Sequence, residues 1–259
     1  MSLGSYVVTG GSSGIGRATA LLLAEKGGSV GILDVQDDAA EDTAQEARRI
    51  GAADARAYHC DVTDEAEVQA TLAKVCSELG VPRGLFANAG IDRGGLLHEL
   101  GVARWESVIQ TNLTGVFLTC KHVLAAMIDA GKGGSIVCTS SPGGFVAFSA
   151  GGAAAYSASK GGISSLVRCM AVDYAQYGIR VNAVVPGPTE TPLMWANVPE
   201  GERAKVRETV SAETPLGRLA DPSEPAQAVV WLLSDAASYV TGSHLICDGG
   251  VLAKAALSV

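Results

Sequence analysis

Tyr156 and Lys160 are the side chains in this sequence whose types and spacing best suit proton transfer. At positions i and i+4 of a predicted helix they share one face. A phenol with its ordinary pKa of about 10 transfers protons poorly at neutral pH. A nearby ammonium favours the phenolate and lowers that pKa, so the pair predicts a general acid/base. The same spacing also occurs by chance in surface pairs, so support from other residues is needed.

Two further groups of polar residues add that support. Ser140 and Ser141 end a predicted strand, sixteen and fifteen residues before Tyr156. Neighbouring side chains of a strand point to opposite faces, so one of the two serines is expected to face the site. Asn112 adds an amide from a long predicted helix, about 102–130. Capping by the serines and bending of the helix by Asn112 are the structural alternatives.

A glycine-rich turn from Thr9 to Gly16 lies between the first predicted strand and the first predicted helix. Glycines at positions 10, 14 and 16 permit positive φ angles and leave room for a ligand to approach the backbone. The amides at the start of the helix then face an anionic pyrophosphate. Tight turns use glycine in any case, but this position favours a dinucleotide site.

Asp34 ends the second predicted strand, about 20 residues beyond the glycine turn. A carboxylate there accepts hydrogen bonds from the adenosine ribose and repels a 2′-phosphate. Ser13 and Val35 are neutral where a basic residue could pair with that phosphate. The pattern therefore predicts NAD, with NADP less favoured; an ordinary surface aspartate is the structural alternative.

Short β-branched runs alternate with segments of helical period, and most of the runs are continuously apolar. This alternation predicts an α/β fold, a Rossmann-like doubly wound parallel sheet of about seven strands with helices on both faces, in one NAD-binding catalytic domain spanning 1–259. The predicted strands are Tyr6–Thr9, Ser29–Leu33, Ala55–Cys60, Gly84–Ala87, Ser135–Thr139, Arg180–Val185 and His244–Cys247.

Helix signals lie between these strands. Asp38 with Glu41 predicts a capped helix that stops at Gly51, and Asp221 predicts another start with Pro222 as first helical residue. The segment 188–220 carries four prolines and two short helical stretches. A long excursion after a strand is expected to form a lid over a ligand, with a surface insertion as the alternative.

Composition excludes several classes of protein. The 259 residues carry 27 acidic and 19 basic side chains, a net charge of −8, and 47% are hydrophobic. Such a chain is not disordered, and without a basic block it is not expected to bind nucleic acid. No uninterrupted apolar run reaches the ~18 residues of a membrane span. Six scattered cysteines and four dispersed histidines predict no metal site and no disulfides. With no signal-peptide pattern at the N-terminus, we expect a cytoplasmic protein.

Taken together, the motifs resemble the short-chain dehydrogenase/reductase family over essentially the whole chain. One residue departs from the family's N-N-A-G motif, with Ala87 in the first position, and the interval from Ser141 to Tyr156 is two residues longer than is common in the family. The matching motifs are T-G-x-x-x-G-x-G at Thr9 to Gly16, N-A-G at Asn88 to Gly90, Y-x-x-x-K at Tyr156 to Lys160, P-G at Pro186-Gly187, the following Thr191, and D-G-G at Asp248 to Gly250.

The resemblance implies roles for individual residues. Tyr156 is implied to be the general acid/base, Lys160 to hold the nicotinamide ribose and lower the tyrosine pKa, and Ser141 to bind the substrate oxygen. Asn112 is implied to hold a water of a proton relay. Thr189 and Thr191 are implied to anchor the nicotinamide carboxamide. The residues expected to bind the cofactor are Gly10, Ser12, Ser13, Gly14, Ile15, Gly16, Asp34, Asp61, Val62, Asn88, Ala89, Gly90, Tyr156, Lys160, Pro186, Gly187, Thr189 and Thr191.

The expected function is an NAD-dependent oxidoreductase that acts on CH–OH groups and interconverts a secondary alcohol and a ketone. A 3-oxoacyl-thioester reductase of the acyl-carrier-protein type is the alternative enzyme, and a non-catalytic dinucleotide-sensing regulator is the alternative of another class. An uncharged, mostly apolar substrate is expected, because no charge lies between Gly143 and Ala155 and because apolar side chains lie near the site, namely Phe145, Phe148, Leu193, Met194 and Trp195. The long helices around 102–130 and 155–177 and the apolar tail 251–257 predict a homotetramer, without a membrane partner.

Overall fold

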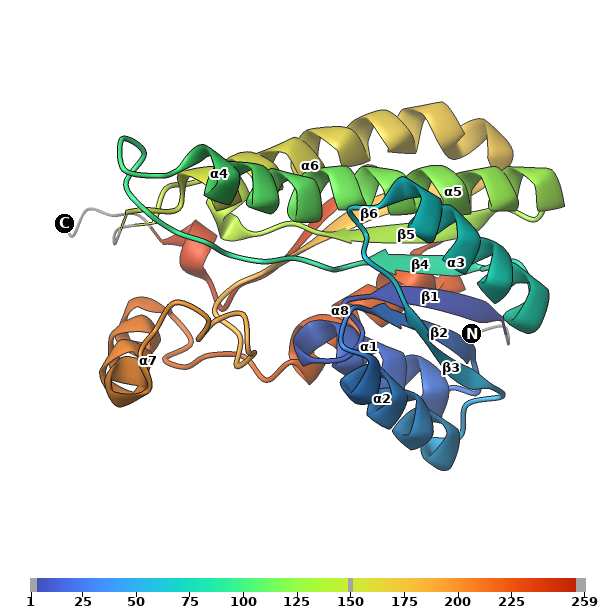
Figure 1. Cartoon of the computed structure of the whole chain (residues 1–259), viewed down its shortest axis with the longest axis horizontal. Helices are drawn as coiled ribbons and strands as arrows, with labels where there is room; N and C mark the ends of the chain where they lie inside the picture. The colour runs from blue at the N-terminus through green and yellow to red at the C-terminus, as the bar shows by residue number, and fades with distance from the viewer. Residues whose placement is uncertain (1–3, 149–150, 255–259) are drawn as a thin grey trace.

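Seven parallel strands form one sheet in the order β3-β2-β1-β4-β5-β6-β7 (Figure 1). The computed structural model describes residues 4–148 and 151–254. The chain order reverses between β1 and β4, and sheets of this kind bind ligands at the carboxyl ends of the strands where the order reverses. The predicted doubly wound sheet is therefore confirmed. The strands are β1 (Ser5–Thr9), β2 (Ser29–Asp34), β3 (Ala55–His59), β4 (Gly84–Ala87), β5 (Gly134–Thr139), β6 (Ile179–Pro186) and β7 (His244–Cys247).

Helices cover both faces of this sheet (Figure 1). One layer contains α1 (Gly14–Glu25), α2 (Asp37–Ile50) and α8 (Ser223–Leu233). The other layer contains α3 (Glu65–Leu79), α4 (Val102–Ile109), α5 (Gly115–Ala130) and α6 (Ala154–Tyr174). Each layer buries its own apolar cluster against the sheet, so the strands are apolar on both faces.

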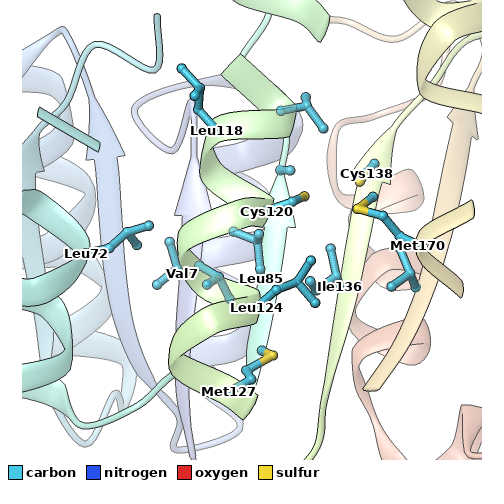
Figure 2. Packing of buried hydrophobic residues seen from close by; sticks show 14 of the residues in the cluster. Val7, Leu72, Leu85, Leu118, Cys120, Leu124, Met127, Ile136, Cys138 and Met170 are labelled. Carbon is cyan, nitrogen blue, oxygen red and sulfur yellow. The ribbon is translucent and has the colours of Figure 1, made fainter. Parts of the chain in front are cut away.

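The core beneath α5 shows how this second layer is held. Figure 2 shows Leu124 and Met127 on the sheet-facing side of α5, with Leu85 of β4 and Ile136 of β5 nearby. Leu124 is 3% exposed, and all four side chains belong to one buried cluster. Burial of such side chains supplies the free energy that offsets the lost chain entropy.

The helix boundaries differ from the sequence prediction at two starts. The cap predicted at Asp38 is wrong, because α2 begins at Asp37 and Gln36 precedes it without a side-chain cap. The Gln36 amide instead donates to the carboxylate of Asp34, at 3.1 Å, so the strand end sets where the helix begins. Pro222 precedes the first residue of α8 by one position. The stop at Gly51 is confirmed, with a φ of 128° that favours glycine.

A continuous helical run extends from Val102 to Ala130, through α4, a π turn at Gln110–Thr114 and α5. With a mean hydropathy of 1.4 it is long and apolar enough to cross a membrane by those two measures alone. Polar and charged residues interrupt its apolar sequence, so no uninterrupted apolar run of that length marks it. Its inner face packs on the sheet, as expected of a core helix.

The chain leaves the sheet after β6 and returns to it before α8. Two backbone hydrogen bonds close this excursion, from the Glu190 amide to the Ala220 carbonyl at 2.9 Å and from the Ala220 amide to the Pro188 carbonyl at 2.8 Å. Between them lie a 3₁₀ turn at Glu200–Glu202 and α7 (Arg203–Glu213), the two short helical stretches that were predicted. Figure 1 shows α7 apart from both helix layers.

Replacing Leu124 by Ala is expected to lower the free energy of unfolding by about 2–5 kcal/mol, because it leaves a cavity between α5 and the sheet. Leu97→Ala makes the same chemical change at a side chain that is 69% exposed, and it should cost at most about 0.5 kcal/mol. Urea denaturation followed by circular dichroism measures both. Equal losses would contradict the assignment of Leu124 to the core.

Candidate active site

The glycine-rich turn between β1 and α1 leaves backbone amides available to an anion. Gly10 and Gly14 have φ angles of 63° and 52°, in the left-handed region that favours glycine. A Cβ at Gly16 would lie 2.0 Å from the carbonyl oxygen of Gly10. Ser13 precedes α1 and makes no side-chain capping bond to the described helix. The first-turn amides, including that of Ile15, can therefore meet a phosphate.

Asp34 lies beside this turn at the end of β2. Its carboxylate accepts hydrogen bonds from the amides of Ser12, at 3.0 Å, and Gln36, at 3.1 Å. The hydroxyl oxygen of Ser12 is buried and has no hydrogen-bond partner among residues 4–148 and 151–254. An unpaired buried hydroxyl next to free amides and a carboxylate fits a nucleotide, with phosphate on the turn and ribose on Asp34.

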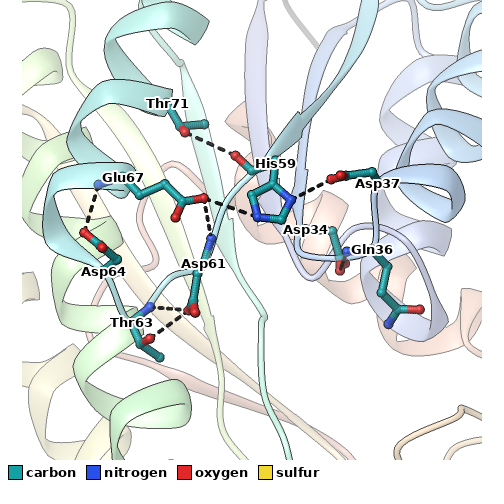
Figure 3. Close-up of polar contacts among 9 residues, drawn as sticks. All are labelled: Asp34, Gln36, Asp37, His59, Asp61, Thr63, Asp64, Glu67 and Thr71. Carbon is teal, nitrogen blue, oxygen red and sulfur yellow. Dashed lines mark hydrogen bonds and ion pairs between the residues drawn. The ribbon is translucent and has the colours of Figure 1, made fainter.

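A second group of charged side chains lies where β2 and β3 end (Figure 3). His59 lies 2.7 Å from the carboxylate of Asp37 and 3.6 Å from that of Glu67. The hydrogen bond to Asp37 raises the pKa of His59. Asp61 accepts two hydrogen bonds from Thr63, so its carboxylate folds back on its own turn. The cofactor-binding roles predicted for Asp61 and Val62 are compatible with their position after β3, at this edge of the sheet, and stay predictions.

The N-A-G segment after β4 attaches to the glycine turn. Asn88 donates from its side-chain amide to the carbonyls of Thr9 and Gly10, each at 3.3 Å. The amide of Ala89 donates to the hydroxyl of Thr9 at 3.1 Å. A Cβ at Gly90 would lie 3.3 Å from the side-chain oxygen of Asn112, so a small residue is needed there. These bonds attach the segment to the glycine turn, beside which it was predicted to bind the cofactor.

Tyr156 and Lys160 meet near the carboxyl end of β5. The ammonium of Lys160 lies 5.5 Å from the centre of the Tyr156 ring and donates to the carbonyl of Thr139 at 2.8 Å. Burial raises the pKa of Tyr156 to about 12, while its hydrogen bond with Ser141 acts in the opposite direction. Burial lowers the pKa of Lys160 to about 8. Desolvation therefore disfavours the charged form of each group.

The two serines at the end of β5 face different sides. Ser140 donates to the carbonyl of Lys160 at 3.2 Å and shares a 2.9 Å hydrogen bond with the hydroxyl of Ser164, so it is fixed against α6. Ser141 acts to lower the pKa of Tyr156, and its hydroxyl accepts a hydrogen bond from the amide of Gly143 at 3.2 Å. The alternation of the strand thus brings Ser141 to the candidate site.

Asn112 is fully buried in the π turn of the long helical run. Its side-chain oxygen accepts from the Ile91 amide at 2.8 Å, and its side-chain nitrogen donates to the Ile91 carbonyl at 2.9 Å and to the Ser159 hydroxyl at 3.2 Å. Asn112 therefore connects the segment after β4 to α6. Single π turns inside long helices occur frequently at functional sites.

The predicted threonines lie on the segment after β6. Thr189 donates to the carbonyl of Gly187 at 2.9 Å, and the Thr191 hydroxyl accepts from the Met194 amide at 3.3 Å. A Cβ at Gly14 would lie 3.0 Å from the Thr191 methyl, so this segment reaches the nucleotide turn. The P-G and D-G-G motifs also meet, because a Cβ at Gly187 would lie 2.5 Å from the Cα of Asp248.

The apolar side chains expected near the substrate do not all lie together. Phe145 makes an edge-on ring contact with His244 of β7, with centroids 5.6 Å apart. The indole of Trp195 donates to Glu190 at 3.2 Å and lies under the guanidinium of Arg207, 5.2 Å from the ring centre. These two rings thus stabilise the surrounding segments. Ser149 and Ala150, also in the uncharged stretch, lie outside the described residues, as does part of the apolar tail, residues 255–257.

Sequence reasoning missed three residues of this site. Thr139 supplies the carbonyl for Lys160, and Ser159 supplies the hydroxyl for Asn112. Asp92 follows the N-A-G motif by two residues, and one of its carboxylate oxygens is buried without a hydrogen-bond partner in the described chain. Position next to a recognised motif is the signal that could have identified all three.

The chain is similar over its whole length to known dehydrogenases. A family model described as enoyl-(acyl carrier protein) reductase matches residues 10–252. Cis-4-hydroxycyclohexanecarboxylate dehydrogenase of Sinomonas cyclohexanicum is 47% identical over 248 residues, 95% of this chain and 96% of that protein. The 2,5-dichloro-2,5-cyclohexadiene-1,4-diol dehydrogenase of Sphingobium indicum is 41% identical, over 96% of this chain and 97% of that protein.

A solved structure also resembles this chain in its fold. The crystal structure of a short-chain type dehydrogenase/reductase from Mycobacterium marinum superposes with a TM-score of 0.91 at 34% identity, and it covers 97% of this chain and 96% of that one. By their names, the close relatives of this chain act on CH–OH groups, and dehydrogenases of this kind use NAD or NADP. This chain belongs to the short-chain dehydrogenase/reductase family.

Proposed function

We propose that this protein is an NAD-dependent oxidoreductase that interconverts a cyclic secondary alcohol and the corresponding ketone. One observation carries the proposal: the ammonium of buried Lys160 lies 5.5 Å from the centre of the Tyr156 ring, at the same sheet edge as the glycine turn, and Ser141 acts to lower the pKa of the same phenol. A proton-transfer group and a nucleotide site at one edge suit hydride exchange between a cofactor and a carbon–oxygen bond.

The chain's own residues supply the proton chemistry. The nicotinamide cofactor supplies or accepts the hydride when it is bound, held by the glycine turn, Asp34 and Lys160. Tyr156 exchanges the proton of the substrate oxygen, and Ser141 holds that oxygen by a second hydrogen bond. Lys160 stabilises the phenolate by its charge. Among the described residues, the side-chain oxygen of Asn112 accepts one hydrogen bond, from the Ile91 amide, and its second lone pair is proposed to hold the relay water.

The preference for NAD rests on the charge beside the glycine turn. The Asp34 carboxylate is directed toward Ser12 and Gln36 by two amides and is 9% exposed, so a 2′-phosphate there would be repelled at close range. Ser13 and Val35 offer no cation to offset the repulsion. The other cofactor-binding assignments made from sequence belong to the same proposal.

A cyclic alcohol is the substrate class that the relatives favour. By their names, the two relatives given above act on a hydroxycyclohexanecarboxylate and on a dichlorocyclohexadienediol. The aromatic ring of Phe148 supports an apolar wall, because a Cβ at Gly143 would lie 3.0 Å from it and 3.2 Å from the Ser157 hydroxyl, next to Tyr156. The segment 188–220 is proposed as the lid of this pocket within one domain.

Two alternatives from the sequence analysis keep a place. The matching family model carries an acyl-carrier-protein description, which favours a 3-oxoacyl-thioester reductase as second candidate. A regulator that binds dinucleotide without turnover is less supported, since Asn112, Ser141, Tyr156 and Lys160 all come together.

Free cysteines throughout the described chain support a cytoplasmic location. The exposed side chains of Phe117 and Val172 on the outer helices support the proposed homotetramer.

Replacing Tyr156 by Phe is expected to lower kcat/KM for alcohol oxidation by about 10²- to 10⁴-fold, because the proton acceptor is removed. Binding of NAD, followed by protein fluorescence, should stay within about threefold, since the ring itself is retained. The absorbance of the reduced cofactor measures turnover over a panel of cyclic alcohols. Near-normal turnover by Tyr156→Phe would refute the proposed mechanism.

Ser141→Ala and Ser140→Ala form a matched pair of variants. Ser141→Ala should lower kcat/KM by about 10²-fold, because a hydrogen bond to the reacting oxygen is lost. Ser140→Ala should keep kcat/KM and lose about 1 kcal/mol of stability, because its partners are structural. Steady-state kinetics and thermal melting measure both. The opposite order of activity losses would show that the serines are assigned the wrong way round.

The cofactor proposal predicts that the wild type binds NAD at least about tenfold more tightly than NADP. Asp34→Asn keeps the shape of the side chain and removes its charge, so the ratio of the two dissociation constants should shift toward NADP by about tenfold. Asp42→Asn, at an exposed position on α2, should leave the ratio unchanged. Calorimetric titration of each protein with NAD and with NADP measures the ratio of the two dissociation constants. Tighter NADP binding by the wild type would favour the acyl-thioester alternative.

A further inference from the structure

The imidazole of His59, the last residue of β3, lies between the starts of α2 and α3 (Figure 3). Its Nδ1 atom is 2.7 Å from a carboxylate oxygen of Asp37, the first residue of α2. Its Nε2 atom is 3.6 Å from a carboxylate oxygen of Glu67, in the first turn of α3. The His59 side chain is 54% exposed, so protons of the solvent reach it freely. One ring therefore bridges two helices that belong to opposite layers.

On the α2 side, this bridge leads to Asp34. The amide of Gln36, directly before Asp37, donates to the Asp34 carboxylate at 3.1 Å. Asp34 of β2 is also the residue paired in register with His59 of β3. The position of Asp37 is therefore tied to the carboxylate that is proposed to bind the adenosine ribose.

On the α3 side, the bridge leads to the segment after β3. The Glu67 oxygen that faces His59, Oε1, also accepts a hydrogen bond from the amide of Asp61 at 3.0 Å. Asp61 and Val62 belong to the residues proposed to bind the cofactor. His59 thus connects two cofactor-binding segments, although neither sequence motif includes it.

The charged groups that act on His59 within the described chain are carboxylates from each element around it. Asp37 belongs to α2, Glu67 to α3 and Asp61 to the turn after β3, and together they raise the pKa of His59. The Asp34 carboxylate on β2 is bound by two backbone amides. An imidazolium donates from both ring nitrogens, whereas a neutral imidazole has one N–H and cannot donate to two carboxylates.

We propose that protonated His59 positions the two cofactor-binding segments, so that NAD binds more tightly while this imidazole carries its charge. The neutral ring releases one of the two helix starts. It also leaves the carboxylates around it without a compensating charge, close to the place proposed for the anionic dinucleotide. The assignment rests on the proposed use of NAD and makes His59 a positioning residue.

The affinity for NAD should fall as the pH rises. His59 is charged below its pKa, which lies above the ordinary value of about 6.5, and the charge is lost as the pH passes through that raised value. Exposed ion pairs contribute little, so the expected loss of affinity from His59 is about threefold between about pH 6 and about pH 9.

Calorimetric titration with NAD over this pH range compares the wild type with His59→Gln, whose amide keeps polar contacts but cannot become charged. The dissociation constant of the variant divided by that of the wild type should be about three near pH 6 and about one near pH 9. A merely structural contact would give the same ratio at every pH. Lys160, with a pKa of about 8, titrates in both proteins and cancels in the ratio.

His98→Gln is the matched control, because His98 is also an exposed histidine beside a carboxylate, 3.5 Å from Glu99. Its ratio to the wild type should stay near one at every pH. Thermal melting checks that both variants are folded.

A second measurement needs no variant. Coupling between two binding events is reciprocal, so NAD should raise the pKa of His59 by the logarithm of the same factor, about 0.5 for a threefold effect. An NMR titration of histidine-labelled wild type, with and without saturating NAD, measures this change. If His59→Gln does not fold, this titration decides alone.

The outcomes separate two failures. Binding of NAD with a ratio that does not change with pH, or with a His59 pKa that NAD leaves unchanged, would overturn the role of His59 and leave the proposed function standing. A wild type that binds no NAD at any pH would overturn the proposed function and, with it, this assignment.

Discussion

The site depends on the hydrogen bonds that Asn88 makes among three strands. Its side-chain nitrogen donates to the carbonyls of Thr9 and Gly10 after β1, and its oxygen accepts from the hydroxyl of Thr139 at the end of β5, at 3.1 Å. A side-chain amide can donate two hydrogen bonds and also accept, so Asn88, after β4, bonds to groups at the ends of both neighbouring strands, β1 and β5. These hydrogen bonds hold the segment after β4 to the ends of β1 and β5.

The same contact couples the nucleotide end to the proton-transfer end. Thr139 donates from its hydroxyl to Asn88 and accepts at its carbonyl from Lys160, so the ammonium is positioned relative to the glycine turn through two residues, Thr139 and Asn88. Asn112 gives a second connection, from Ile91 to α6. Groups on strands and helices are held more accurately than groups on loops, and hydride exchange needs that accuracy between two bound molecules.

The parallel sheet and the pairing of Tyr156 with Lys160 can be predicted from the sequence, because both depend on local patterns. Buried strands are continuously apolar, and Tyr156 and Lys160 share a helix face through their spacing. The π turn at Asn112 has no such pattern, since contacts with Ile91 far along the chain stabilise it. The interpretation of Trp195 as a pocket residue misses Arg207, whose contact with the ring depends on how the segment folds. Tertiary contacts therefore determine both the π turn at Asn112 and the surroundings of Trp195.

Two opposing electrostatic effects act on the proton of Tyr156. Burial raises the pKa of Tyr156 to about 12 and lowers that of Lys160 to about 8, because desolvation disfavours the charged form of each group. The negative charge of Asp92 acts in the same direction on Tyr156. Alcohol oxidation needs the phenolate, so its rate rises with pH toward the pKa of Tyr156.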